Sequence, residues 1–240
     1  ILVPVFHKGE HFFTVGVKAH QADIGNSQPT TYFAAARDVY QEGALIFPCV
    51  QVQRDFKNNE DIIRMCQRRI RVPEQWYGDY LAAIGAARIG ERRLKDFINK
   101  YGAKAVHKFI ENWLNYSERR TTDAIQALPS GQFVAEAEHD PIDKYIPLGL
   151  RIKADINIDS DNGKITVDLT DNPDCVDAGL NLTQATATMS ATQAVLCCLD
   201  SDIPHNSGSL RRIDVILREN CIVGIPRFPH SCSVATTNMT

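Results

Sequence analysis

His20 and Asp23 stand three positions apart, just after the apolar run 12–17 and just before a Gly-Asn turn. We expect the pair at the mouth of a strand, where the backbone leaves the sheet. An imidazole beside a carboxylate suits Mn, Fe or Zn, and it also suits general-base catalysis. The alternative is a loop anchor whose side chains hydrogen-bond to the turn, because two ligands are too few for a metal site.

Four other polar side chains extend this set of candidates. Glu42 follows Gln41 in an apolar context, and its carboxylate is either a second acid or base beside Asp23 or a surface residue in a turn. Asn206 separates an apolar helical stretch from a strand, where an amide can hold an oxyanion or carbonyl. The alternative for Asn206 is a simple turn residue. Asn26 and Tyr32 follow the His-Asp pair, and with Asn206 they are the candidate substrate-binding residues.

The segments that must position these residues fall into three regions. Residues 1–57 contain two apolar runs that predict a β-hairpin, followed by a long loop of functional length. Residues 58–130 show helical periodicity, and residues 131–240 alternate apolar and polar residues around one apolar helix at 183–199. Because strands and helices are segregated, we expect an α+β fold: a hairpin-rich sheet with a separate group of long helices.

Local signals predict where the helices begin and end. Asn58 and Asn59 can cap a helix, Pro73 suits the first turn of a long one, and Gly102 is placed to end it. A strand is expected at 209–217. The charged runs 68–71, 91–96 and 117–120 are interpreted as solvated helix faces. Four aromatic residues at helical spacing are expected in the core rather than in a cofactor site, namely Trp76, Tyr80, Phe109 and Trp113.

Composition limits the class of protein. A net charge of −3 leaves no basic surface for nucleic acid, and no apolar stretch approaches a membrane span. Neither GxxxxGK[ST] nor GxGxxG after a strand occurs, so no nucleotide-binding loop is expected in this chain. Seven cysteines without a CxxC pair favour free thiols in a reducing cytoplasm. The chain opens directly into a strand-like run, without the pattern of a signal peptide.

Several motifs in order resemble those of the hydantoinase B family. They are AHQADIGN, DVYQEGALIFP, RVPEQWYGDYLAAIGAARIGERRL, DLTD at 168–171, IPHNSGSLRRIDVI and the final SCSVATTNMT. The family includes the B subunits of N-methylhydantoinases, the matching half of 5-oxoprolinase, a caprolactam-hydrolysing enzyme, and the large subunits of acetone and acetophenone carboxylases. The resemblance covers nearly the whole chain.

The resemblance implies a metal, a partner and a larger subunit. In the family a Thr-His-x-x-Asp segment precedes the strand that corresponds to residues 1–6, and its His and Asp are metal ligands in the carboxylases. The resemblance therefore implies that His20 completes a site for Mn, Zn or Fe, and that this chain is a fragment of a larger subunit. It also implies that ATP is bound by a hydantoinase A-like partner in a hetero-oligomer.

Three functions are compatible with this resemblance. Amide-hydrolysing relatives commonly begin the motif with His-His, whereas this chain has His20-Gln21, which is more similar to acetone carboxylase. We therefore expect ATP-dependent carboxylation of an acetone- or acetophenone-like ketone, with Tyr32 facing an aromatic substrate. The alternative is ATP-dependent hydrolysis of a cyclic amide such as a hydantoin, 5-oxoproline or a lactam. A third possibility is a scaffold subunit without catalysis.

Overall fold

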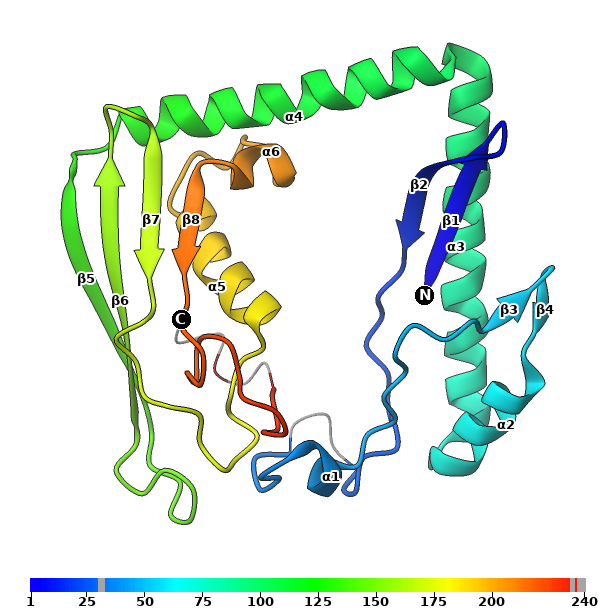
Figure 1. Ribbon diagram of the computed structural model, residues 1–240, viewed down its shortest axis with the longest axis horizontal. Coiled ribbons are helices and arrows are strands. Elements are labelled where there is room, and N and C mark those ends of the chain that lie inside the picture. The colour runs from blue at the N-terminus through cyan, green and yellow to red at the C-terminus, as the bar shows by residue number, and fades with distance from the viewer. Residues whose placement is uncertain (30–32, 234–235, 237–240) are drawn as a thin grey trace. The chain divides into compact units, whose positions relative to one another are not determined.

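The structure is a computed structural model, and it describes residues 1–29, 33–233 and 236 (Figure 1). The predicted substrate-binding residue Tyr32 lies outside the described residues. The chain forms two compact units, one of residues 1–31 and 43–109 and the other of residues 32–42 and 110–240. Strands and helices are segregated along the chain, which confirms the predicted α+β class.

The first unit sets a β-hairpin and a short β-ribbon beside two helices (Figure 1). Its elements are β1 (Leu2–His7), β2 (Glu10–Gly16), β3 (Gln53–Arg54), β4 (Lys57–Asn58), α2 (Glu60–Arg69) and α3 (Pro73–Tyr101). The hairpin β1–β2 is antiparallel, as the two apolar runs predict. A small core joins the helices, because Ile63 of α2 packs with Tyr80 and Ile84 of α3.

The helix ends of this unit follow the local signals in the sequence. The Asn59 side chain caps α2 by accepting a hydrogen bond from the Asp61 N–H at 3.2 Å. Pro73 occupies the first turn of α3, and Gly102 ends that helix with a φ of 81°. A left-handed backbone of this kind suits glycine, which has no Cβ to clash.

The second unit is built on a four-stranded sheet in the order β5-β6-β7-β8. Neighbouring strands are antiparallel except for the parallel pair β7–β8. Its elements are α1 (Val39–Glu42), most of α4 (Ala103–Gln126), β5 (Gly131–His139), β6 (Leu150–Asp159), β7 (Lys164–Asp168), α5 (Gln184–Cys197), α6 (Ser207–Leu210) and β8 (Ile213–Ile216). Side chains of β6, β7 and α5 share one core with the loop residues Leu180, Leu182 and Ile222.

One sequence prediction about the elements is wrong in its bounds, and another is wrong about burial. The strand expected at 209–217 covers only Ile213–Ile216, because the preceding residues Ser207–Leu210 form the short helix α6. Phe109 and Trp113 were expected in the core, but 58% and 46% of their surfaces are exposed. The prediction for Tyr80 is confirmed, since it is 6% exposed, and Trp76 is partly buried beside it.

The residues that α4 buries explain why Phe109 and Trp113 are not in the core. Ser117, Thr121 and Ile125, spaced four residues apart, are fully buried. The Ser117 and Thr121 hydroxyls donate to the carbonyls of the preceding turn, so these polar side chains are satisfied inside the helix groove. This narrow face admits close packing and leaves the aromatic face outside. Among the described residues, no helix is long and apolar enough to cross a membrane.

Candidate functional site

His20 lies in irregular backbone, four residues beyond the end of β2 at Gly16. Pairing in the hairpin stops where the Val17 N–H donates to the Ile1 carbonyl at 2.9 Å, so His20 is set further from the strand than its apolar run predicts. The His20 side chain is exposed. Ala19 and Gln21, on either side of it, line a pocket of the first unit.

Asp23 is held by Arg71, which follows α2. The Asp23 carboxylate accepts hydrogen bonds from the Gly25 N–H at 2.8 Å and the Arg71 N–H at 2.9 Å. The Arg71 guanidinium also donates to both carboxylate oxygens, at 3.1 and 3.2 Å. Arg71 additionally donates to the main-chain oxygens of Asn26 and Ser27, at 2.7 and 3.2 Å. Arg71 therefore links the Asp23 carboxylate to the main chain of the turn that follows it.

These contacts also set the ionisation of Asp23. Burial by itself raises the pKa of this carboxyl, but the two backbone N–H donors and the Arg71 guanidinium outweigh it and hold the pKa below its ordinary value. A carboxylate in this state is ionised and a weak base. The geometry thus supports the loop-anchor alternative, and a catalytic role for Asp23 stays a prediction.

Arg69, the last residue of α2, also contacts this turn. It donates to the Gly25 carbonyl at 3.1 Å and to the Gly43 carbonyl at 2.7 Å. Gly25 has a φ of 81°, and a Cβ there would lie 2.8 Å from the Arg69 Cγ, so glycine is required. Beneath these contacts Asn26 is only 2% exposed, a poor position for the predicted contact with substrate.

The charged run 68–71 is therefore not only a solvated helix face, as its sequence suggested. Both arginines lie within hydrogen-bonding distance of a turn more than 40 residues earlier in the chain. The signal that could have identified them is the placement of this run at and just beyond the end of α2, where side chains are free to reach a neighbouring loop.

A metal requires more donors than this turn supplies. No group of three or more His, Cys, Asp or Glu side chains is placed to hold a metal ion anywhere in the described part of the chain. Asp23 is already saturated by Arg71 and the backbone. By themselves these residues do not make a metal site, and His20 would need donors from elsewhere. Metal binding by His20 stays a prediction.

Glu42 lies in the second unit, as the last residue of α1. Its Oε2 accepts a hydrogen bond from the Ser231 hydroxyl at 3.1 Å. Burial raises the pKa of the Glu42 carboxyl, and the Ser231 hydroxyl offsets this only in part. Glu42 can therefore retain a proton closer to neutral pH than an exposed glutamate, which is the property that a general acid or base needs.

Two segments far apart in the chain meet around Glu42. Val39 N–H donates to the Pro229 carbonyl at 3.0 Å, and Ser231 N–H donates to the Arg37 carbonyl at 3.2 Å. The same contact brings Cys232 near Glu42. Burial, with smaller effects from Cys175 and Glu42, raises the pKa of the Cys232 thiol to about 11, so this thiol is not a thiolate nucleophile at neutral pH.

His230 stands beside this contact and was not singled out in the sequence. Its Nδ1 donates to the Arg227 carbonyl at 2.7 Å, and its Nε2 lies 3.5 Å from the Asp177 carboxylate. His230 and Asp177 line a pocket of about 310 Å³ together with Arg37, Asp38 and Pro229. The family-like segment SCSVATTNMT begins one residue later, at Ser231, and was the available signal for this part of the chain.

Asn206 is a helix cap. Its side-chain oxygen accepts from the Gly208 N–H at 2.8 Å, and its side-chain nitrogen donates to the buried Ser117 hydroxyl at 2.7 Å. These bonds use the amide for folding, as the turn alternative implies, and substrate binding by Asn206 stays a prediction. Within the second unit, Asn206 contacts α4 whereas Glu42 contacts the segment around Ser231, so they are held by different elements.

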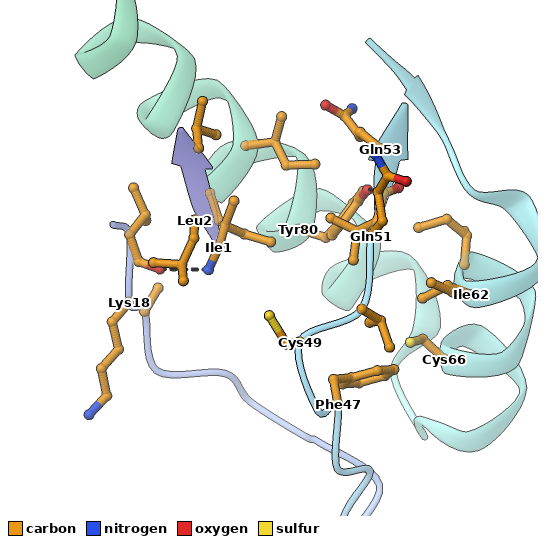
Figure 2. A pocket seen from close by; sticks show the side chains of 18 of the residues that line it. Ile1, Leu2, Lys18, Phe47, Cys49, Gln51, Gln53, Ile62, Cys66 and Tyr80 are labelled. Atoms are coloured by element: carbon orange, nitrogen blue, oxygen red, sulfur yellow. Dashed lines mark hydrogen bonds between the residues drawn. The ribbon is translucent and has the colours of Figure 1, made fainter. Parts of the chain in front are cut away.

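The first unit also contains a large pocket beside the His20 segment (Figure 2). Its volume is about 870 Å³. The walls come from the start of β1, the segments 17–21 and 47–53, and the facing sides of α2 and α3. Its volume is within the range of roughly 300–1,000 Å³ that is common for small-molecule sites.

Comparisons with known proteins assign this arrangement to one family. The family model described as Hydantoinase B/oxoprolinase matches residues 1–240. A protein of Pseudomonas sp. (strain NS671), named as a D-/L-hydantoinase subunit, is 33% identical over 95% of this chain and 40% of its own length. The beta subunit of the caprolactamase of Pseudomonas jessenii is 28% identical over 89% of this chain and 36% of its own.

Solved structures have the same fold. The ATP-dependent caprolactamase from Pseudomonas jessenii superimposes with a TM-score of 0.88 and 25% identity, over 98% of this chain and 40% of that one. A nucleotide-free acetone carboxylase superimposes with a TM-score of 0.82 at 17% identity, over 96% of this chain and 32% of that one, which shows likeness of fold alone. The chain thus spans about 40% of the length of the first relatives it matches.

Proposed function

This chain belongs to the hydantoinase B/oxoprolinase family, and from that membership we propose that it forms part of the catalytic subunit of an ATP-dependent enzyme that opens a cyclic amide. The observation that carries the proposal is the likeness to proteins named for amide substrates. The hydantoinase subunit is 33% identical in sequence, and the caprolactamase is similar in both sequence and structure. The acetone carboxylase is similar in fold only.

Opening a cyclic amide requires attack of water at the carbonyl carbon and delivery of a proton to the ring nitrogen as the C–N bond breaks. Phosphorylation of the amide oxygen by ATP would supply the activation. Glu42 is the proposed proton-transfer group of this chain, because burial gives its carboxyl a raised pKa and the Ser231 hydroxyl orients it. Asp23 has a lowered pKa and is proposed to position the turn around His20.

The partner and its location are further parts of the proposal. No nucleotide-binding loop motif occurs in the sequence, so ATP is proposed to bind a hydantoinase A-like partner in a hetero-oligomer. The support is that relatives are named as subunits. A cytoplasmic location is proposed from seven cysteines without a CxxC pair.

Carboxylation of a ketone is the second candidate function. The observation that favours it is the His20-Gln21 start of the motif, which resembles acetone carboxylase, together with the shared fold. In that reaction the activated enol would attack carbon dioxide, and bicarbonate would be consumed. A scaffold subunit without catalysis is the third candidate.

Phosphate release separates the three candidates. The full-length protein is purified with its partner and supplied with ATP and either hydantoin or acetophenone, each with and without bicarbonate. A cyclic-amide hydrolase releases phosphate and ring-opened product from hydantoin without bicarbonate. Release that requires both the ketone and bicarbonate would assign the carboxylase instead. If the assembled complex turns over neither compound, and none of a panel of lactams and ketones, the result would favour the third candidate, a scaffold subunit without catalysis.

A further inference from the structure

The pocket of the first unit is lined mainly by apolar side chains that the fold leaves partly exposed. Phe47, Val50 and Leu2 are 41%, 39% and 71% exposed, although each lines the pocket. Apolar surface gathered in a concave site is a common mark of ligand binding. In Figure 2, side chains from β1, the 47–53 segment, α2 and α3 surround one space.

The polar side chains of the pocket include three amides and two cations. Gln21, Gln51 and Gln53 line it, together with Lys18 and Arg88. None of the described residues that line it is an aspartate or a glutamate. A positively charged ligand would therefore find no counter-ion there, and it would lose hydration without compensation.

Two buried polar atoms in these walls lack partners. Gln21 Oε1, an acceptor, and Arg88 Nε, a donor, make no hydrogen bond among the described residues. The rest of the Arg88 guanidinium is engaged, since it donates to Glu91 at 2.8 Å and lies over the Phe56 ring. Both atoms are buried inside the walls and do not face the pocket. The side-chain amide of Gln51, which lines the pocket and is exposed, carries a donor and an acceptor that complement the N–H and carbonyl of an amide ligand.

We propose that this pocket binds a small molecule that carries no positive charge and is composed of an apolar body and an amide, with the apolar body against the walls from β1, α2 and α3. The inference rests on the proposed function only in its choice of a cyclic amide as the ligand class. The evidence for the pocket itself is its volume, its largely apolar lining, the side-chain amides among its polar groups and the lack of carboxylates among the described residues that line it.

Cys49 offers a direct reporter of binding. It is exposed, it lines the pocket, and its side chain projects from the 47–53 segment toward the middle of the pocket (Figure 2). Cys197 and Cys198 are also exposed but belong to the second unit and do not line the pocket, so they are internal controls. Alkylation by iodoacetamide is measured at each cysteine by peptide mass spectrometry, without ATP or partner turnover.

The probe is 5-benzylhydantoin, and the full-length protein is used. At a concentration of about ten times its Kd, measured by calorimetry, it should slow Cys49 alkylation about tenfold, because the rate follows the fraction of empty sites. Alkylation of Cys197 should be unchanged. The cationic analogue 5-(4-aminobutyl)hydantoin should give little protection at the same concentration, because the pocket has no carboxylate to pair with it.

A matched pair of variants on α3 tests the location. Ala83 lines the pocket, whereas Ala82 is exposed beside it and does not. Ala83→Trp should abolish protection of Cys49 and Ala82→Trp should preserve it, with melting temperatures measured for both. If Ala83→Trp does not fold, the smaller Ala83→Leu takes its place and should weaken protection.

Several results would overturn the inference. They are no heat of binding for 5-benzylhydantoin, equal slowing at Cys49 and Cys197, equal protection by the cationic analogue, and full protection in the folded Ala83 variants. These outcomes are independent of catalysis. A complex that turns over no cyclic amide but shows selective protection of Cys49 would contradict the proposed function and leave the pocket assignment intact.

Discussion

Arg71 determines the conformation of the turn that contains Asp23 and Asn26. Arg71→Lys keeps the charge but loses the planar fork that donates to several acceptors at once. We expect a loss of about 1–2 kcal/mol in the free energy of unfolding, measured by urea titration. Arg68→Lys, on an exposed position of the same helix, is the control and should change it by less than about 0.5 kcal/mol.

The same contact predicts a dependence on pH. The pKa of Asp23 is lower in the folded protein than its ordinary value near 3.9, so its contribution to stability is fully present above that value. This contribution is lost as the pH falls below about 4 and through the lower folded pKa. Asp23→Asn should remove that part of the acid dependence. Identical acid transitions for the two proteins would contradict this account.

Glu42 should behave in the opposite way. Because burial raises its pKa in the folded protein, the stability linked to Glu42 is present below its ordinary pKa of about 4.3 and is lost as the pH rises through the folded value. The melting temperatures of Glu42→Gln and the wild type are compared at pH 4 and near pH 7. The difference should shift in favour of Glu42→Gln at the higher pH, because only the wild type then carries a buried charge at this position. If Glu42 is the proton-transfer group, the Glu42→Gln substitution should also lower turnover by about 10²–10⁴-fold.

The Ser231→Ala substitution tests whether the effect of Glu42 on catalysis is distinct from its effect on stability. The hydroxyl that donates to Glu42 lowers the carboxyl pKa, so its removal should raise that pKa further. The limb of the pH–rate profile that belongs to Glu42 should then move to higher pH. A catalytic profile that is unchanged in Ser231→Ala, with normal turnover in Glu42→Gln, would exclude Glu42 from the chemistry.

His20 carries the metal prediction. Its side chain is exposed, so His20→Ala should change the free energy of unfolding by less than about 1 kcal/mol. Turnover and the metal content of the full-length protein should both fall, because loss of one of a few ligands weakens a metal site. His11→Ala, at another exposed histidine of the same unit, is the control. Full metal content and normal turnover in His20→Ala would refute ligation by His20.

At the scale of elements, the sequence predicts those features that depend on neighbouring residues. Asn59, Pro73 and Gly102 mark helix ends through capping, a fixed φ and a left-handed backbone, all of which are local. The buried face of α4 was not predictable in this way. Its aromatic stripe is the stronger periodic signal, yet Ser117 and Thr121 are the buried positions. The segment at Asn206 and Gly208 approaches α4 closely there, through the Ser117 hydroxyl and the Leu114 carbonyl.

The approach of α6 to α4 gives a sharp test of this packing. A Cβ on Gly208 would lie 2.0 Å from the Leu114 carbonyl oxygen, and backbone cannot move aside as a flexible side chain can. Gly208→Ala should lower the free energy of unfolding, measured by urea denaturation, by about 1–3 kcal/mol. Gly85→Ala is the matched control, because a Cβ there meets nothing within 4 Å and alanine favours a helix by about 0.5–1 kcal/mol. Equal stabilities for the two variants would contradict the close approach.

At the scale of the whole molecule, the parts of the candidate sites come from distant segments. Asp23 and Arg71 are 48 residues apart, and Glu42 and Ser231 are 189 apart. Composition and spacing identify Asp23 and Glu42 as side chains capable of chemistry, but the partners that set their pKa values are fixed only by the fold. For the same reason the sequence predicts the α+β class and most elements, but it does not identify Arg71 or Ser231.

The two units differ in the size of their hydrophobic cores. This difference predicts which unit unfolds locally more often. Among the described residues, the core of the second unit gathers 16 buried side chains, whereas the core around Ile63 in the first unit gathers three. Local opening costs least where few apolar side chains are buried. Amide hydrogens of β6 and β7 should therefore exchange more slowly than those of β1 and β2, measured by mass spectrometry under native conditions.

Ligand binding should reduce the difference in amide exchange rates between the two units. A molecule that occupies the pocket of the first unit stabilises that unit by mass action, so saturating 5-benzylhydantoin should slow exchange in β1 and α3. Exchange in β6 and β7 should change little, because none of the lining residues belongs to the second unit. Ala83→Trp should abolish the effect and Ala82→Trp should retain it. Uniform slowing across both units would instead indicate that the ligand stabilises a single cooperative structure, and it would contradict the independence of the two cores.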